Sequence, residues 1–476
     1  PIPSQMSIGA TWDPAIAQQV GTQVGLELSK LGINLLLGPN LDVMSDPSPG
    51  LSDLGVRSFG GDPFWVAKLG QSYIKGVHLG SQNNIAVVAK YFPGLGSSDR
   101  LPEKEVATVR KTLEQLRQID LTPFFAVTGN APDLESSADA LLNSHIRYQG
   151  LQGNIRSTTR PISLDPQAFD LLMSLSPLGT WRNAGGIIVS DNLGSQALQN
   201  LFDPSGQSYN INRVAVDAFI AGNDILYLGN YGDVNKPIPN HEIIDTIELF
   251  AQKYTEDQDF AERVDTSVLR ILTLKNEIYA SFNLSSVLTP ENGLSSLGQG
   301  KVDELVARNS ATLVNPEISE LGTILQPPPT TGDRLVILTD TDTTSLCSSC
   351  PETPILGKDS LENAIIRLYG PYSGRQLARA NITSYSFREL TTLLDYPSSS
   401  EQMVSDLQNA NWIIIATQDL DSDRPYSSAL IRLLAERQDL IRNKKVIVFA
   451  LSAPYYLDAT NISKVSAFIA LYNRLP

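Results

Sequence analysis

The chain has 476 residues, a length that allows two or three domains, each large enough to bury its own apolar core. Its 51 Asp and Glu residues outnumber its 36 Lys and Arg residues, and the net charge of −15 argues against nucleic acid as a partner because it repels phosphate backbones. The longest apolar runs, such as 446–451, are too short to span a membrane, which takes about 20 residues.

Short β-branched runs alternate with longer amphipathic stretches over residues 1–282. In chain order, the predicted elements are helix 14–31, strand 33–39, helix 63–79, strand 85–92, helix 103–118, strands 124–130 and 139–144, helix 165–175, strand 185–191, a helix ending near 200, helix 211–221, strand 224–229 and two helices within 240–282. Alternation of strands and helices over this length predicts an α/β fold with a parallel sheet, either a barrel or a doubly wound sheet.

Polar residues stand at the ends of five of these strands, namely Asn40 and Asp42, Lys90, His145, Asp191 and Asn230. In a (β/α)8 barrel such positions form the C-terminal rim, where active sites lie. A turn or a helix cap would explain any one of them alone. Their recurrence favours a shared site at the rim.

A second α/β region follows a segment rich in Ser, Leu, Gly and Pro. We expect this segment, residues 283–330, to be a linker. After it, the predicted elements are strand 334–340, helix 359–366, strand 365–370, helix 401–408, strand 412–419, helix 426–441, strand 445–451 and helix 462–474. This pattern predicts an αβα sandwich over residues 331–476.

Several segments of the first region form a recognisable pattern. They are LGINLLLGPNLDV (31–43), GVRSFGGDP (55–63), VVAKYFPGLG (87–96), GGIIVSDNLGSQAL (185–198) and AFIAGNDILYLG (218–229). In this order and spacing they resemble the catalytic barrel of family 3 glycoside hydrolases, and GVRSFG resembles the β-N-acetylhexosaminidase branch more than the β-glucosidases. Residues 331–476, which include KVIVFALSAPYYL, are similar to the second domain of that family.

The resemblance implies a (β/α)8 TIM-type barrel over residues 1–282, a linker at 283–330 and an αβα sandwich over 331–476. About six strands are predicted before the linker instead of eight, so we expect the N-terminal strands of the barrel to be missing from this chain. The implied activity is exo-acting, retaining hydrolysis of terminal β-linked sugars, with β-N-acetylglucosaminides preferred. The alternatives are a β-glucosidase or a phosphorylase of the same family, and a non-catalytic carbohydrate-binding homologue.

Asp191 matches the catalytic nucleophile of the family. A retaining glycosidase needs a carboxylate that attacks the anomeric carbon, and an Asp at the end of a buried strand is held rigidly at the rim. The alternative is that Asp191 caps the helix that follows, because Asp is a favoured N-cap residue. Asp224, which begins the next predicted strand, is expected to support the barrel.

Five further residues are expected at the sugar site. Arg57 and Lys90 match residues that bind sugar hydroxyls in the family, and an Arg within an apolar stretch or a Lys at the end of a buried strand is unusual for a surface charge. Tyr91 stands where the hexosaminidase branch has a histidine. His145 matches a strand-end histidine of the family, with a packing role as the alternative. Asp42 is expected to position Arg57 or to bind a hydroxyl.

The proton donor of the hexosaminidase branch is absent. That branch carries an Asp-x-His pair in the loop after the second motif, whereas no histidine occurs between His78 and His145 in this chain. Asp99 is the candidate acid/base on this loop. Glu103 and Glu105 look like acidic residues in the first turn of the predicted helix 103–118. In other branches the acid/base is a Glu of the second domain, which no motif locates.

No cofactor is implied, and the expected partner is a carbohydrate substrate, with the oligomeric state left open. His78, His145 and His241 are the only histidines and lie far apart, so no metal site is expected. We expect Cys347 and Cys350 to form a local disulfide, with free thiols as the alternative. A disulfide and a polymer-degrading role favour an extracytoplasmic or secreted location, whereas a recycling role would favour the cytoplasm.

Overall fold

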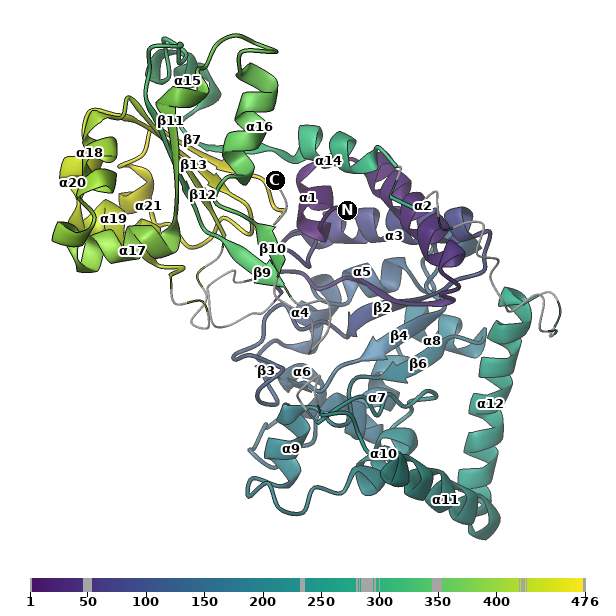
Figure 1. The fold of residues 1–476 in the computed structure, drawn as a ribbon. Helices are drawn as coiled ribbons and strands as arrows, with labels where there is room; N and C mark the ends of the chain where they lie inside the picture. The colour runs from purple at the N-terminus through teal and green to yellow at the C-terminus, as the bar shows by residue number, and fades with distance from the viewer. Residues whose placement is uncertain are drawn as a thin grey trace. The chain divides into compact units, whose positions relative to one another are not determined.

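The computed structural model of the chain describes residues 2–45, 54–231, 236–279, 281, 283, 294, 297–298, 300–344, 353–418, 420, 424 and 426–473. Two compact units make up the chain, Pro1–Val306 and Ala307–Pro476, and each has its own sheet (Figure 1). Within the described residues, no helix has both the length and the apolar character needed to cross a membrane.

The first unit is built around a parallel sheet with the strand order β1-β2-β4-β6. Its strands are β1 (Leu35–Asn40), β2 (Ala86–Phe92), β4 (Ala140–Asn143) and β6 (Ile187–Ser190). Each strand pairs in parallel with the next strand of the sheet, and helices connect them along the chain (Figure 1). Strands β3 (Thr108–Val109) and β5 (Arg147–Tyr148) form a separate short parallel ladder. This arrangement is an α/β fold.

The helices of the first unit begin where the sequence supplies caps. Asp13 accepts a hydrogen bond from the Ala15 N–H at the start of α2, and Asp62 accepts from two N–H groups at the start of α3. The two helices pack backbone against backbone, since a Cβ atom at Gly21 would lie 2.1 Å from the Tyr73 carbonyl oxygen. The helices are α1 (Gln5–Ala10), α2 (Pro14–Lys30), α3 (Pro63–Ser81), α4 (Leu113–Gln118), α5 (Thr122–Ala126), α6 (Gln149–Gln152), α7 (Pro166–Met173), α8 (Ser176–Asn183), α9 (Gln196–Phe202), α10 (Ile211–Ile220), α11 (Asn240–Glu256) and α12 (Gln258–Ile278).

Two predicted elements of the first unit are wrong. The helix predicted at 103–118 begins only at Leu113, because Thr112 and Gln115 form a capping box there, and residues before it form a loop and β3. The strand predicted at 124–130 is helix α5 followed by turns, with Phe124 fully buried. A short apolar run cannot by itself be assigned to a strand or to a buried helix. The loop before α4 becomes important for the site.

The segment predicted as strand 224–229 runs beside β6 without forming a full strand. Ser190 N–H donates to the Ile225 carbonyl at 2.9 Å, and Leu193 N–H donates to the Tyr227 carbonyl at 2.9 Å. Val189 and Ile225 form a single parallel bridge. The segment therefore extends the order of the sheet by one position beyond β6.

The second unit contains a mixed sheet with the strand order β11-β8-β12-β13-β14-β7. All neighbouring pairs are parallel except β14 with β7. Alternate residues of β8 face two apolar cores. Val336 and Leu338 pack with helix α17 (Phe387–Asp395), whereas Leu335 and Ile337 lie in the cluster that contains Ile365 of helix α16 (Ser360–Tyr369). The strands are β7 (Thr312–Asn315), β8 (Leu335–Thr339), β11 (Ile382–Ser386), β12 (Trp412–Thr417), β13 (Lys445–Ala450) and β14 (Ala467–Ala470), and β9 (Asp342–Thr344) pairs separately with β10 (Thr353–Leu356).

Helices cover this sheet, and three predictions need correction. The helices of the second unit are α15 (Ile318–Ile324), α16 (Ser360–Tyr369), α17 (Phe387–Asp395), α18 (Glu401–Asn409), α19 (Ala429–Glu436), α20 (Gln438–Ile441) and α21 (Ala459–Ile462), whereas α14 (Val302–Ser310) spans the boundary between the two units at Val306. The predicted strand 365–370 lies largely in helix α16, and the predicted helix 462–474 contains β14, because short apolar runs fit either structure. The predicted linker 283–330 contains α14, β7 and α15, and β7 is held by pairing with β14. Cys347 and Cys350 lie outside the described residues.

Candidate active site

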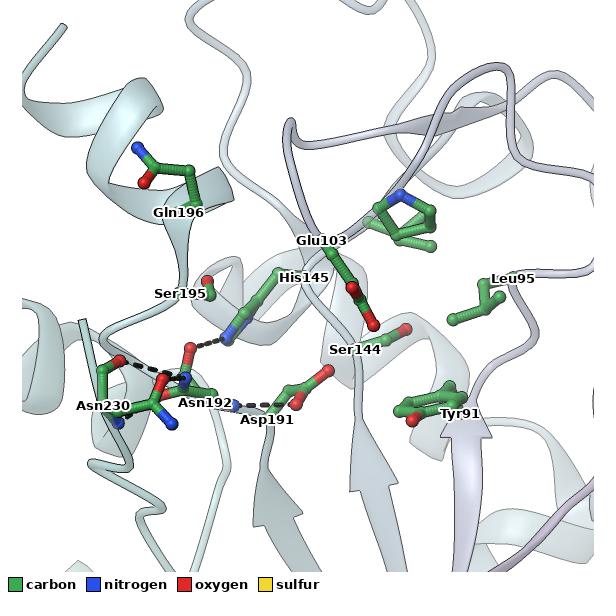
Figure 2. Close-up of a pocket in the computed structure, with 12 residues that line it drawn as sticks. Tyr91, Leu95, Glu103, Ser144, His145, Asp191, Asn192, Ser195, Gln196 and Asn230 are labelled. Atoms are coloured by element: carbon green, nitrogen blue, oxygen red, sulfur yellow. Dashed lines mark hydrogen bonds between the residues drawn. The ribbon is translucent and has the colours of Figure 1, made fainter. Parts of the chain in front are cut away.

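A pocket of about 300 Å³ opens at the carboxyl ends of β2, β4 and β6 in the first unit (Figure 2). Because the ends of parallel strands meet at one edge of a sheet, loops from distant parts of the chain line it together. The lining residues are Tyr91, Leu95, Pro102, Glu103, Ser144, His145, Ile146, Asp191, Asn192, Ser195, Gln196 and Asn230. Of the predicted site residues, the pocket thus brings together Asp191, Tyr91 and His145.

Asp191 directly follows β6 and lines the pocket. Its backbone N–H donates to the Asn143 carbonyl of β4 at 3.1 Å, so the sheet ladder continues through it. One carboxylate oxygen accepts the Asn192 N–H at 2.8 Å. The alternative that Asp191 caps the following helix is wrong, because α9 begins at Gln196 and its cap is Ser195, whose side chain accepts the Leu198 N–H. The carboxylate is therefore held at the pocket for another role.

His145 fixes the turn that carries Asp191. The Nε2 atom of His145 donates to the Asn192 carbonyl at 3.0 Å, so its Nδ1 accepts from the Ser163 hydroxyl at 2.7 Å. Burial lowers the pKa of His145, against the charge of Asp191, and favours the neutral ring. Both nitrogens are thus engaged within the protein. This geometry gives His145 a positioning role, although its ring also lines the pocket.

Two asparagines of the pocket complete the turn. The side-chain amide of Asn192 donates to the backbone and side-chain oxygens of Asn230, each at 3.1 Å, and its own oxygen accepts the Gly194 N–H at 3.0 Å (Figure 2). Asn192 was not predicted as a site residue. Its place directly after Asp191 is the signal that identifies it.

Lys90 and Arg57 share an electrostatic environment with Asp191. Burial and the positive charge of Arg57 lower the pKa of Lys90, whereas the carboxylates of Asp191 and Asp42 act in the opposite direction. The Lys90 amine lies 5.0 Å from the centroid of the Tyr91 ring. Neither Lys90 nor Arg57 is among the lining residues of the pocket. The positive charge of Lys90 therefore interacts with the Asp191 carboxylate, and the charge of Arg57 acts on Lys90.

Asp42 is fully buried, and its carboxylate accepts hydrogen bonds from backbone N–H groups. Its carboxylate accepts the N–H groups of Leu95 at 2.6 Å and Tyr91 at 3.4 Å, and its carbonyl accepts the Ser58 hydroxyl at 2.8 Å. Burial raises its pKa to about 7. The expectation that Asp42 binds a hydroxyl is wrong, because its oxygens are directed at the protein. Through Ser58 it holds the loop that carries Arg57.

Asp99, the predicted acid/base, does not meet the requirements of a proton donor. Its carboxylate accepts the Thr108 N–H at 2.8 Å and pairs with Arg100 at 3.1 Å and Arg110 at 3.4 Å. Partial burial opposes these contacts, but the hydrogen bonds and the two guanidinium charges hold its pKa below the usual value. Asp99 is also not among the residues that line the pocket.

Glu103 stands on the same loop and lines the pocket with Asp191. Figure 2 shows its side chain extending from the loop into the pocket, on the side that faces Asp191. The sequence reasoning placed Glu103 in the first turn of a helix that does not exist there. The sequence alone could not separate Glu103 from Glu105, because only the path of the loop decides which of the two side chains reaches the pocket.

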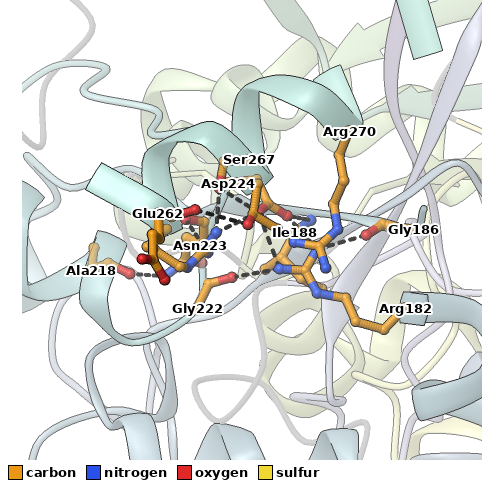
Figure 3. A network of polar contacts seen from close by, with 12 residues as sticks. Arg182, Gly186, Ile188, Ala218, Gly222, Asn223, Asp224, Glu262, Ser267 and Arg270 are labelled. Carbon is orange, nitrogen blue, oxygen red and sulfur yellow. Dashed lines mark hydrogen bonds and ion pairs between the residues drawn. The ribbon is translucent and has the colours of Figure 1, made fainter. Parts of the chain in front are cut away.

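Asp224 lies at the centre of a buried network of polar contacts (Figure 3). Its buried carboxylate accepts from Arg182, from Arg263 at 3.0 Å, from the Ser267 hydroxyl at 2.7 Å and from the Ile188 N–H at 2.9 Å. Burial would raise its pKa, but these hydrogen bonds and charges hold it below the usual value. The network ties helix α12 to β6, and so secures the strand that ends at Asp191.

Metal chemistry has no evident ligand set in this part of the chain. Among the residues that the structure describes, no three or more His, Cys, Asp or Glu side chains come together as a metal site.

The fold and the site together define an α/β protein with two carboxylates in a pocket at the carboxyl ends of parallel strands, the edge of the sheet where α/β enzymes carry their active sites. The family model described as "Glycosyl hydrolase family 3 N terminal domain" matches residues 1–274. The chain therefore belongs to glycosyl hydrolase family 3.

Two beta-hexosaminidases are similar to the chain at modest sequence identity. The chain is 26% identical over 288 residues to beta-hexosaminidase A of Pseudoalteromonas piscicida, covering 57% of this chain and 43% of that protein. It is 31% identical over 133 residues to a beta-hexosaminidase of Hydrogenovibrio crunogenus, covering 28% of this chain and 34% of that protein. The chain thus spans less than half the length of these two relatives.

Two solved structures share the fold. A family 3 beta-N-acetylglucosaminidase from a Paenibacillus species has a TM-score of 0.68 at 20% identity, covering 100% of this chain and 78% of that one. A beta-glucoside phosphorylase has a TM-score of 0.71 at 16% identity, covering 99% of this chain and 75% of that one.

Proposed function

We propose that the protein is an exo-acting, retaining β-glycosidase that removes terminal β-N-acetylglucosamine. The observation that supports this proposal most directly is that two carboxylates, Asp191 and Glu103, line one pocket at the strand ends. Retaining glycosidases use such a pair, one as nucleophile and the other as acid/base. The relatives called beta-hexosaminidase support the N-acetylglucosaminide preference.

The proposed fold of the first unit is part of a (β/α)8 barrel. Its strands pair in the sequence β1, β2, β4, β6, and the segment from Asp224 continues that order. Each step is a parallel neighbour reached through helices, as in a barrel.

In the proposed mechanism, Asp191 attacks the anomeric carbon and forms a covalent glycosyl-enzyme. Its backbone bond to Asn143 and its bond from the Asn192 N–H hold the carboxylate in place. Glu103 gives a proton to the leaving oxygen, then removes one from the water that releases the sugar. Tyr91 lines the pocket that would take the sugar ring. Lys90 and Arg57, which the family resemblance assigns to sugar hydroxyls, would reach the sugar from beside the pocket, where the charge of Lys90 interacts with Asp191.

The first test is turnover of p-nitrophenyl N-acetyl-β-glucosaminide and p-nitrophenyl β-glucoside. We expect the first to be the better substrate, with the β-anomer as the first product by NMR. Asp191→Asn should lower kcat on the order of 10⁶-fold, the scale seen when a nucleophile is removed. Absence of turnover on a broad β-glycoside panel would leave a non-catalytic sugar-binding protein. Turnover that requires phosphate would identify a phosphorylase.

The second test separates Glu103 from its neighbours. An activated leaving group needs little protonation, so Glu103→Gln should slow N-acetylglucosaminyl disaccharides by about 10²–10⁴-fold but p-nitrophenyl release much less in the first turnover. Azide should accelerate Glu103→Gln, because it replaces water without needing a general base. Glu105→Gln is the matched control, since Glu105 pairs with Arg100 at 2.7 Å and does not line the pocket. Equal losses in Glu103→Gln and Glu105→Gln would contradict the assignment.

A further inference from the structure

Three aromatic side chains form a cluster on the surface of the first unit. The ring centroids of Trp12 and Trp65 lie 5.3 Å apart at an interplanar angle of 84°, and those of Phe64 and Trp65 lie 5.6 Å apart at 81°. Trp12 is 58% exposed and Phe64 is 56% exposed, whereas Trp65 is half-buried. We call these three residues the aromatic cluster. Single exposed apolar residues are normal on a protein surface, but a contiguous group of them marks an interaction site.

The backbone at Trp12 is strained. Its φ angle is +53°, in the left-handed region that glycine and asparagine adopt far more readily than a bulky side chain does. The residue lies between α1 and α2, and its N–H donates to the Gly9 carbonyl at 3.0 Å. A turn alone would therefore form more easily with glycine or asparagine at this position. A strained backbone that holds a large ring in solvent is a feature of binding sites.

The rings stand on a closely packed scaffold. Helix α1 lies so near the loop before α3 that a Cβ atom at Gly9 would be 1.9 Å from the Phe59 carbonyl oxygen. Asp62 fixes the start of α3, because its carboxylate accepts the Phe64 N–H at 2.9 Å and the Trp65 N–H at 3.1 Å. Rings that are already held in place lose little conformational entropy when a ligand binds.

The aromatic cluster lies on the same edge of the sheet as the pocket. Helix α3 follows β1, so it begins on the side of the carboxyl ends of the strands. After β1, the Met44 N–H donates to the Gly60 carbonyl at 3.0 Å, just before α3. The Ser45 N–H donates to the Gly96 carbonyl at 3.1 Å, beside Leu95 of the pocket wall. No ring of the aromatic cluster lines the pocket, so the two are separate sites on one edge.

The polar groups beside the rings suit a sugar better than an anionic surface. Asp13 directly follows Trp12, and its Oδ1 caps α2 by accepting the Ala15 N–H at 2.8 Å. Asp62 lies two residues before Phe64 and caps α3 through its own Oδ1. An ionised carboxylate has about four acceptor sites, so both can also accept hydroxyl hydrogens. Their negative charge, within a chain of net charge −15, disfavours an anionic membrane or an acidic polymer.

We propose that the aromatic cluster binds an uncharged oligosaccharide chain at a site separate from the pocket. The ligand class is a chain of β-linked neutral sugars, such as an oligomer of N-acetylglucosamine. The apolar face of a sugar ring packs on the exposed rings, and its hydroxyls donate to the carboxylates beside them, the combination of aromatic surface and few polar groups that is typical of ligand sites. The inference goes beyond the proposed function, because binding at the aromatic cluster does not require hydrolysis in the pocket.

Quenching of tryptophan fluorescence by acrylamide tests this proposal. Of the four tryptophans, Trp181 and Trp412 are buried, at 7% and 5% exposure, so the quenching reports on Trp12 and Trp65. The probe is the β-1,4-linked tetramer of N-acetylglucosamine, added to Asp191→Asn so that it is not consumed. We expect the tetramer to protect both tryptophans from acrylamide in a saturable manner. Binding in the pocket does not produce this signal, because neither tryptophan lines it.

Variants in the same background locate the protection. Trp12→Asn removes one ring but accepts the left-handed backbone, so the urea midpoint should stay near that of the parent. Protection of Trp65 should then need about tenfold more tetramer, the scale of losing one aromatic anchor. Phe64→Ala should have a similar effect. Tyr254→Asn is the matched control, since Tyr254 is a 43% exposed aromatic residue of α11 outside the aromatic cluster, and its titration should match the parent.

The absence of protection by the tetramer would overturn the proposal, and so would equal titrations of the parent and Trp12→Asn. Protection by phosphatidylcholine vesicles or by a higher protein concentration, in place of the tetramer, would identify a lipid surface or a second copy of the chain and would also overturn it. If no glycoside is hydrolysed by the native protein, the proposed function fails, while protection by the tetramer still decides whether the aromatic cluster binds sugar.

Discussion

The substitution Asp224→Asn tests whether the buried charge network secures the strand that carries Asp191. The Asp224 side chain is 0% exposed, and Arg182, which it pairs with, is 11% exposed. The change to Asn keeps the shape but removes the negative charge, so the guanidiniums of Arg182 and Arg263 lose their counter-ion. Removal of one member of a buried ion pair costs about 3–5 kcal/mol. We expect a loss of that size in the free energy of unfolding of the first unit.

Urea denaturation followed by tryptophan fluorescence measures this loss. The substitution Trp412→Phe removes the one tryptophan of the second unit, so the three others report on the first unit alone. Asp217→Asn is the matched control, because Asp217 forms a partly exposed pair with Arg160 and should cost less than about 1 kcal/mol. If Asp224→Asn costs no more than Asp217→Asn, the network does not hold the strand as argued.

Two further predictions concern stability. Because burial raises the pKa of Asp42 to about 7, the folded state keeps this proton longer than the unfolded state, and the stabilisation present at pH 4 is lost as the pH rises through 7. The stability of the native chain relative to Asp42→Asn should fall by about 4 kcal/mol between pH 4 and pH 8, and a pH-independent difference would refute this. Ser195→Ala should cost about 1 kcal/mol by removing the cap of α9, while an unchanged urea midpoint would contradict that role.

Local sequence was sufficient to predict a residue's position where a single strand or helix end determines its surroundings. The apolar run before Asp191 predicts a buried strand, and the structure places the carboxylate directly after β6 at the pocket. The caps at Asp13 and Asp62 likewise follow from residue type and position, because capping involves only the nearest N–H groups. The family resemblance, which depends on the order of short motifs, was confirmed by the match over residues 1–274.

Short apolar runs did not determine their own secondary structure. The segments predicted as strands at 124–130 and 365–370 contain helices, and β14 lies within a predicted helix. Such runs are buried in either conformation, and only their neighbours decide which backbone hydrogen bonds form. The same holds for β7, which exists because β14 offers it a partner far along the chain.

The candidate site contains features that the sequence alone could not predict. By itself the sequence determined the α/β class, the family and Asp191 as the strand-end carboxylate, since these depend on local pattern and motif order. Only the tertiary structure distinguished Asp99, which two guanidiniums and one backbone N–H hold as a carboxylate, from Glu103, which reaches the pocket from the same loop. It also brought Arg100, Arg110, Arg147 and Arg156 together around one hollow. Electrostatic partners lie far apart along the chain, so their effects appear only when the fold brings them together.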